Sequence, residues 1–221
     1  MNDFSFYFRF GWDHILTTDA LDHMLFIAAL AAIYMLRDWK QVIILVTAFT
    51  IGHSITLALT SLEILTLPIE WVEFFVPVTI MITAIFNLFQ KNFTPRSVRL
   101  NYAFALFFGL IHGMAFASLL RIVLASDQNF ALSMLSFSIG LELGQILVVI
   151  IILLLAQLFV KILGVNRRDW VIFVSAAVFS LALQMALERI PGKDNEDETL
   201  MQNSPAFQIT SEPKTLLNKH A

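Results

Sequence analysis

The chain has 221 residues, of which 58% are hydrophobic and 14% charged, and its formal net charge is −3. Soluble domains carry about 25% charged residues, so this composition excludes an ordinary soluble domain and indicates an integral membrane protein. The absence of cysteine excludes disulfides and thiolate metal sites. With no cluster of basic residues, no nucleic-acid partner is expected.

Long apolar segments predict an all-α fold, a polytopic transmembrane helical bundle in the lipid bilayer. One span needs about 20 apolar residues, because the hydrocarbon core is about 30 Å thick. Six spans are predicted, at about 21–36, 41–61, 71–89, 101–124, 130–160 and 170–187. The aromatic segment 4–16 is expected to lie as an amphipathic segment at the membrane interface. If it enters the bilayer instead, the spans number seven.

The same pattern predicts two regions and an orientation. Residues 1–190 form the transmembrane bundle with its N-terminal interfacial segment, and the polar tail 191–221 is expected to be disordered. Lys and Arg in short loops mark the cytoplasmic side of a membrane. They gather after the first, third and fifth predicted spans, for example at Arg37 and Lys161. We therefore expect a protein of the cell membrane with both termini extracytoplasmic.

Ionisable residues of the predicted spans gather in their outer half. A charged side chain at the bilayer centre costs roughly 2.5–3.5 kcal/mol, so such groups usually face the bundle interior and find partners there. Imidazole and carboxylate together suit divalent transition metals. A lone histidine in a span is more often an interhelical hydrogen-bond donor, so the expectation of a metal site rests on convergence. The candidate metal ligands are His14, Asp22, His23, His53, Glu73, His112 and Glu142.

Residues beside these candidates predict how the helices pack. Gly109 and Gly113 flank His112, and small residues let helices approach closely. Ser138, Glu142 and Gln145 share one face of their helix, because residues three and four apart are neighbours on a helix surface. Asn87 is expected to make a hydrogen bond to another helix. Asp19 is expected to cap a helix N-terminus rather than bind a metal.

Five blocks of the sequence resemble, in order, those of the HupE/UreJ family. They read HILTTDALDHMLFIAALAAIY, TAFTIGHSITLAL, VEFFVPVTIMITAIFN, FGLIHGMAFA and GLELGQ. The resemblance implies a small polytopic membrane protein, and some members are regarded as nickel or cobalt permeases. It also implies metal recognition by His14, Asp22 and His23, and allows metalloenzyme-maturation proteins as partners. Seven residues separate His14 from Asp22 here, where nickel permeases of this type usually show five.

Three functions are compatible with these residues. The first, favoured by the resemblance, is a permease for a divalent transition metal (nickel, cobalt or zinc), which makes the chain a transporter rather than an enzyme. The second is an intramembrane metal-dependent hydrolase, in which the bound metal activates water. The third is a proton-coupled carrier or a membrane scaffold without metal, since intramembrane His and Glu can relay protons.

Overall fold

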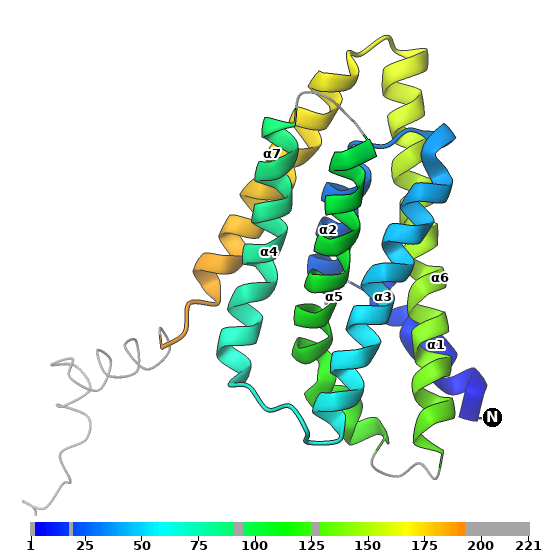
Figure 1. The fold of residues 1–221 in the computed structure, drawn as a ribbon, viewed down its shortest axis with the longest axis vertical. Coiled ribbons are helices and arrows are strands. Elements are labelled where there is room, and N and C mark those ends of the chain that lie inside the picture. The colour runs from blue at the N-terminus through cyan, green and yellow to red at the C-terminus, as the bar shows by residue number, and fades with distance from the viewer. Residues whose placement is uncertain (1–2, 18–19, 91–94, 125–128, 193–221) are drawn as a thin grey trace, which may run out of the picture.

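The fold is a bundle of long helices (Figure 1). The computed structural model describes residues 3–17, 20–90, 95–124 and 129–192, and in α5 it describes the side chains of residues 102–116 only. These parts of the chain contain no strand. The helices are α1 (Asp3–Leu16), α2 (Leu21–Ala31), α3 (Trp39–Ser61), α4 (Ile69–Phe89), α5 (Pro95–Leu124), α6 (Phe130–Gln157) and α7 (Arg167–Glu188). Two short turns join them, the 3-10 helix η2 (Leu36–Asp38) and the π-helix η3 (Leu158–Ile162).

Most of the predicted spans coincide with helices of the structure. Within the described residues, 4 helical segments are long and apolar enough to cross a membrane, namely Leu36–Ser61, Ile69–Phe89, Phe130–Ile162 and Arg167–Glu188. They correspond to the second, third, fifth and sixth predicted spans. Helix α5 covers the fourth. The helical membrane architecture is therefore confirmed, whereas the count of six spans and the location of the termini stay predictions.

The first predicted span is wrong in length. Helix α2 has 11 residues, about 16 Å at about 1.5 Å per residue, which is too short to cross the hydrocarbon core alone. It ends at Ala31, and the chain then turns into η2, where the Asp38 carboxylate accepts a hydrogen bond from the Met35 backbone N–H at 3.1 Å. Most of its side chains are buried, and it packs against α4, α6 and α7. A helix that is apolar on all sides is typical of a bundle centre, so α2 is the central helix.

Helix α1 packs along the first half of α6 with its backbone almost touching. A Cβ atom added to Gly11 would lie 2.1 Å from the Phe137 carbonyl oxygen, and one added to Gly140 would lie 2.0 Å from the Phe8 carbonyl oxygen. These contacts require glycine on both helices. The location of α1 relative to a bilayer stays a prediction.

Helices α3 and α5 meet in the same way. A Cβ on Gly52 would lie 2.3 Å from the Leu106 carbonyl oxygen, and one on Gly113 would lie 2.2 Å from the His53 carbonyl oxygen. The close approach predicted from the glycines beside His112 is therefore confirmed. The hydrogen bond expected of Asn87 is also present, since its Nδ2 donates to the Ala29 carbonyl of α2 at 2.6 Å.

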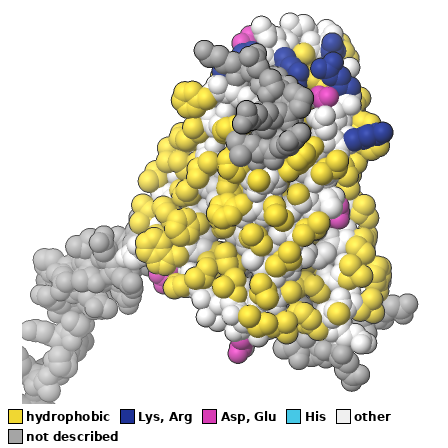
Figure 2. Space-filling model, viewed as in Figure 1, with side chains coloured by type: hydrophobic (Ala, Val, Ile, Leu, Met, Phe, Trp, Pro, Cys, Tyr) yellow, Lys and Arg dark blue, Asp and Glu magenta, His cyan; other side chains and the backbone are white. Residues whose placement is uncertain are grey.

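Charged residues divide the two ends of the bundle. We call the end where α3 and α7 begin the basic end, which carries Arg37, Lys40, Lys161, Arg167 and Arg168, and Lys and Arg gather there in Figure 2. At the opposite, acidic end lie Glu63, Glu70 and Glu73. Asp19, Lys91 and nearly all of the polar tail lie outside the described residues.

The α3–α5 contact predicts an effect of a single methyl group. In Gly109→Ala the new Cβ would lie 2.2 Å from the Phe49 carbonyl oxygen, so the helices must separate. Overpacking costs about 1–3 kcal/mol, and the melting temperature in detergent should fall by roughly 2–4 °C per kcal/mol.

Gly144→Ala is the matched control, because its Cβ would lie 3.2 Å from the Ile15 Cβ and 3.4 Å from the Trp12 carbonyl oxygen, much farther than the 2.2 Å contact at Gly109. We expect a much smaller change there, since alanine also favours helix. Equal melting temperatures for the two variants in a thermal scan would contradict a backbone contact between α3 and α5.

Candidate metal site

A pocket of about 210 Å³ lies where five helices converge near the acidic half of the bundle. The ends of α1 and α7, the start of α2, the first turns of α4 and the middle of α5 contribute to its wall. The polar lining residues are His14, Asp22, His23, Glu73, His112 and Arg189. Five of the seven predicted metal ligands therefore line one pocket.

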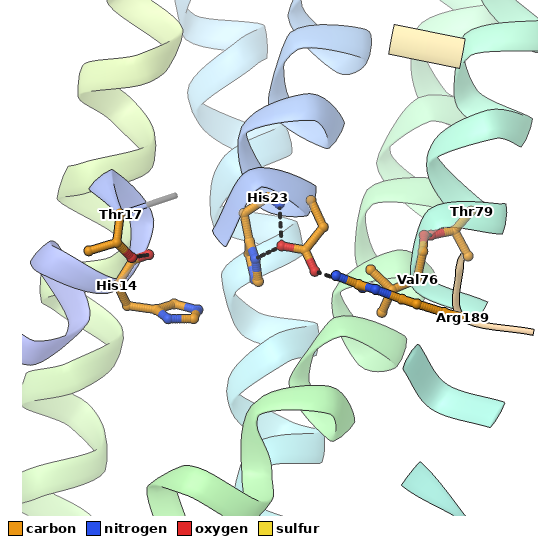
Figure 3. A network of polar contacts seen from close by, with 7 residues as sticks. His14, Thr17, His23, Val76, Thr79 and Arg189 are labelled. Atoms are coloured by element: carbon orange, nitrogen blue, oxygen red, sulfur yellow. Dashed lines mark hydrogen bonds and ion pairs between the residues drawn. The ribbon is translucent and has the colours of Figure 1, made fainter. Parts of the chain in front are cut away.

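Asp22 and His23 form the centre of this group. The Asp22 Oδ1 atom lies 2.9 Å from His23 Nδ1 and also accepts the His23 backbone N–H at 2.8 Å. The other carboxylate oxygen, Oδ2, lies 3.8 Å from Nη1 of Arg189 at the end of α7 (Figure 3). A neutral imidazole that donates from Nδ1 to a carboxylate has its lone pair on Nε2. Asp22 thus orients His23 so that Nε2 can act as a ligand.

Three further imidazole rings surround His23. The ring centroids of His14, His53 and His112 lie 5.1, 5.6 and 5.0 Å from that of His23. His53 and His112 are fully buried, and His23 is 4% exposed. His53 does not line the pocket but lies behind His23. The four histidines, from α1, α2, α3 and α5, therefore form one contiguous cluster.

Apart from His23 Nδ1, which bonds to Asp22, the buried ring nitrogens of this cluster have no hydrogen-bond partners within the described residues. They are Nε2 of His14, Nε2 of His23, and both Nδ1 and Nε2 of His53 and of His112. A buried polar group without a partner costs about 1–3 kcal/mol, so native proteins rarely leave several together. A cation would take up the lone pairs of such nitrogens, and water could accept their N–H groups.

Asp22, His23 and His112 come nearest to a metal-binding geometry. Each offers one ligand atom, and these atoms lie within 4.8 Å of one another. Ligand atoms at about 2.1 Å from a metal lie at most about 4.2 Å apart, so small side-chain rotations would complete the set. The donor set of imidazole and carboxylate without thiolate fits nickel, cobalt or zinc.

Phenylalanine rings close the cluster on its basic side. Phe26 follows His23 by one turn, and Phe49 and Phe108 each precede a histidine of their own helix by one turn. The ring centroid of Phe26 lies 4.9 Å from that of Phe49 and 5.5 Å from that of Phe108. All three rings are at most 2% exposed. The cluster is therefore reached from the pocket, and an apolar layer separates it from the other end of the bundle.

Glu142 stands apart from the pocket. Its Oε1 accepts a hydrogen bond from Thr47 Oγ1 at 2.5 Å, and Thr47 precedes His53 by six residues, about 9 Å along the helix. Gln145 on the same face of α6 accepts from Thr50 at 3.0 Å. The predicted polar face of α6 therefore pairs with threonines of α3, and the structure does not bring Glu142 to the imidazoles.

The remaining candidates differ in exposure. His14 is half-buried, with its ring centroid 4.0 Å from that of Phe116. Glu73 is exposed at the pocket rim. Pro77 lies one turn after it and cannot donate the usual helical hydrogen bond, which frees the Glu73 carbonyl. Arg189 also lines the pocket but was not among the predicted site residues. The sequence feature that could have indicated it is a basic residue on the side of the membrane where acidic residues predominate.

Comparisons with known proteins agree with this arrangement. A family model described as "HupE / UreJ protein" matches residues 1–189. A search of curated proteins and a search of solved structures gave no match. The matched range contains every described helix and all of the pocket residues named above. The chain therefore belongs to the HupE/UreJ family and is an integral membrane protein.

Proposed function

We propose that this protein is a permease of the cell membrane that carries a divalent transition-metal ion, with nickel and cobalt as the first candidates. The observation that carries the proposal is the cluster of four histidines whose buried ring nitrogens lack partners among the described residues. Some members of the family are regarded as nickel or cobalt permeases, which supports the same substrate class.

In this proposal the ion enters from the pocket and is held by Asp22, His23 and His112. The carboxylate charge offsets part of the hydration that the ion loses, and the imidazoles favour transition metals over calcium or magnesium. His14 and Glu73 stand nearer the mouth, where they can accept the ion first. His53 lies deeper, beside His23, as the next ligand along the path.

Passage toward the basic end requires that the phenylalanine layer open. On the basic side of the histidines the Phe26 ring packs against the rings of Phe49 and Phe108 and forms an apolar layer. Hydrophobic constrictions of this kind can gate an ion path. In this proposal the ion path is open toward the acidic end, which we expect to face the extracytoplasmic side, and closed toward the basic end.

One observation favours an intramembrane hydrolase as the second candidate. The pocket of about 210 Å³ has room for several water molecules, each of which takes about 30 Å³ in the liquid. A metal held by Asp22, His23 and His112 could activate one of them, with Glu73 as general base. A hydrolase keeps its metal through purification, whereas a permease exchanges it, so metal exchange with a labelled ion in solution separates the two.

Asp22→Asn should weaken binding of nickel or cobalt by about 10–100-fold, because it removes the negative charge beside His23 while keeping an oxygen that can accept the His23 N–H. Calorimetric titration of the detergent-purified protein measures this. Asp13→Asn is the matched control, since Asp13 is exposed and pairs only with Arg9 one turn away. Equal affinities of the two variants would remove Asp22 from the site.

His53→Gln should reduce uptake of radioactive nickel or cobalt into cells by at least about tenfold, since glutamine keeps much of the volume but cannot replace a buried imidazole ligand. His220→Gln, in the C-terminal tail, is the control for loss of a histidine. Uptake by His53→Gln at the wild-type rate would contradict the proposed path. A purified wild-type protein that binds no metal would instead favour the carrier or scaffold without metal.

Glu142→Gln should leave metal affinity within about twofold of wild type, because the carboxylate is bonded to Thr47, which lies about 9 Å along α3 from His53. The amide retains an oxygen that can accept the threonine hydroxyl. His112→Gln, measured in the same titration, provides the contrast of a lost ligand. A loss in Glu142→Gln as large as that in His112→Gln would place Glu142 in the site.

A further inference from the structure

A second hollow lies at the basic end of the bundle, far along the helices from the histidines. It has a volume of about 630 Å³ and opens to the surface between η2 and the segment that joins α6 to α7. Its wall combines cationic, amide and apolar side chains. The residues used below are Leu36, Arg37, Trp39, Gln157, Lys161 and Arg167.

Positive charge dominates this hollow. Three cations, Arg37, Lys161 and Arg167, line it. The nearby carboxylate of Asp38 is engaged, since its Oδ2 accepts the Met35 backbone N–H and its Oδ1 lies 3.6 Å from Arg37 Nε. Lys161 has no carboxylate within ion-pair distance among the residues that the structure describes. The hollow therefore carries a net positive charge.

The orientation rule for membrane proteins explains why cations lie at this end, but not why three of them share one hollow. Two others at the same end are used differently. Arg168 donates to the carbonyl oxygens of Gln90 and Leu88 and so ties α7 to the end of α4. Lys40 Nζ lies 5.7 Å from the centroid of the Trp39 ring. Arg168 and Lys40 therefore do not line the hollow, whereas Arg37, Lys161 and Arg167 do.

The backbone around Lys161 departs from the α-helix. Residues Leu158–Ile162 form a π-helix at the end of α6, and this wider turn brings Lys161 to the wall of the hollow. Such π-turns occur frequently at functional sites. On the facing wall, the Arg167 Nη2 donates to the Ile33 carbonyl at 2.5 Å, which holds the guanidinium in place.

We propose that this hollow binds the headgroup phosphate of an anionic glycerophospholipid. The volume lies within the range of about 300–1,000 Å³ that is usual for ligand sites, and a free phosphate ion would fill only a small part of it. Exposed apolar side chains flank the hollow, with Leu36 39%, Trp39 49% and Ile162 73% exposed, and can contact acyl chains. Basic pockets between helices at a cytoplasmic membrane surface are suited to anionic headgroups.

The test uses the full-length protein in neutral detergent, with phosphatidylglycerol, phosphatidylcholine or inorganic phosphate added. Phosphatidylglycerol should raise the melting temperature in a concentration-dependent way, because a ligand that binds only the folded state stabilises it. Native mass spectrometry should find the same lipid retained. Lys161→Gln and Arg37→Gln should each weaken its binding by about fivefold.

Lys40→Gln is the matched control, because Lys40 is a cation of the same end that does not itself line the hollow and contacts it through the Trp39 ring. It should bind phosphatidylglycerol as the wild type does. Equal stabilisation by phosphatidylcholine or by inorganic phosphate would overturn the proposal, as would equal losses in Lys40→Gln and Lys161→Gln. Nickel or cobalt affinity should be unchanged in all three variants, so the result stands or falls separately from the metal site.

Discussion

The candidate site depends on helix backbones that touch without side chains between them. Imidazoles from four different helices can meet only if those helices lie unusually close. Glycines provide this twice, at Gly52, Gly109 and Gly113 between α3 and α5, and at Gly11 and Gly140 between α1 and α6. The first contact brings His53 and His112 together, and the second brings the end of α1 to the same level. The short helix α2 then places Asp22 and His23 between them.

This arrangement buries imidazole nitrogens, which are good metal ligands, in surroundings where a nitrogen without a hydrogen-bond partner destabilises the fold. The histidine rings are surrounded by phenylalanines, so few neighbouring groups can satisfy their nitrogens. Buried polar atoms without partners destabilise a fold, and binding of a cation or water would remove part of that cost. In the proposed function, ion binding therefore stabilises the bundle, and the same rings form the apolar layer that the ion would have to pass.

The two hollows lie at different depths in the bundle and differ in the charge of the side chains that line them. The pocket near the acidic end combines Asp22 and Glu73 with imidazoles, which suits a cation. The hollow at the basic end has a net positive charge and an apolar rim, which suits an anionic amphiphile. Between them lie the phenylalanine layer and the hydrogen bonds of α6 with Thr47 and Thr50. The distribution of charge along the bundle thus underlies both proposals, a cation at one end and an anionic lipid at the other.

The sequence by itself determined the helical class, most helix positions and the residue types of the site. Apolar runs report span lengths directly, because a bilayer has a fixed thickness, and an ionisable residue in such a run must turn inward. Only the tertiary structure decided which ionisable residues meet. Glu142 was predicted as a ligand beside the histidines but bonds to Thr47, and Arg189, at the end of α7, lies 3.8 Å from Asp22. The sequence likewise did not indicate that α2 is short, because a buried central helix and a membrane span have the same apolar composition. Hydropathy records how strongly a residue avoids water, whereas the partner of each side chain depends on the rotation and spacing of helices distant in sequence.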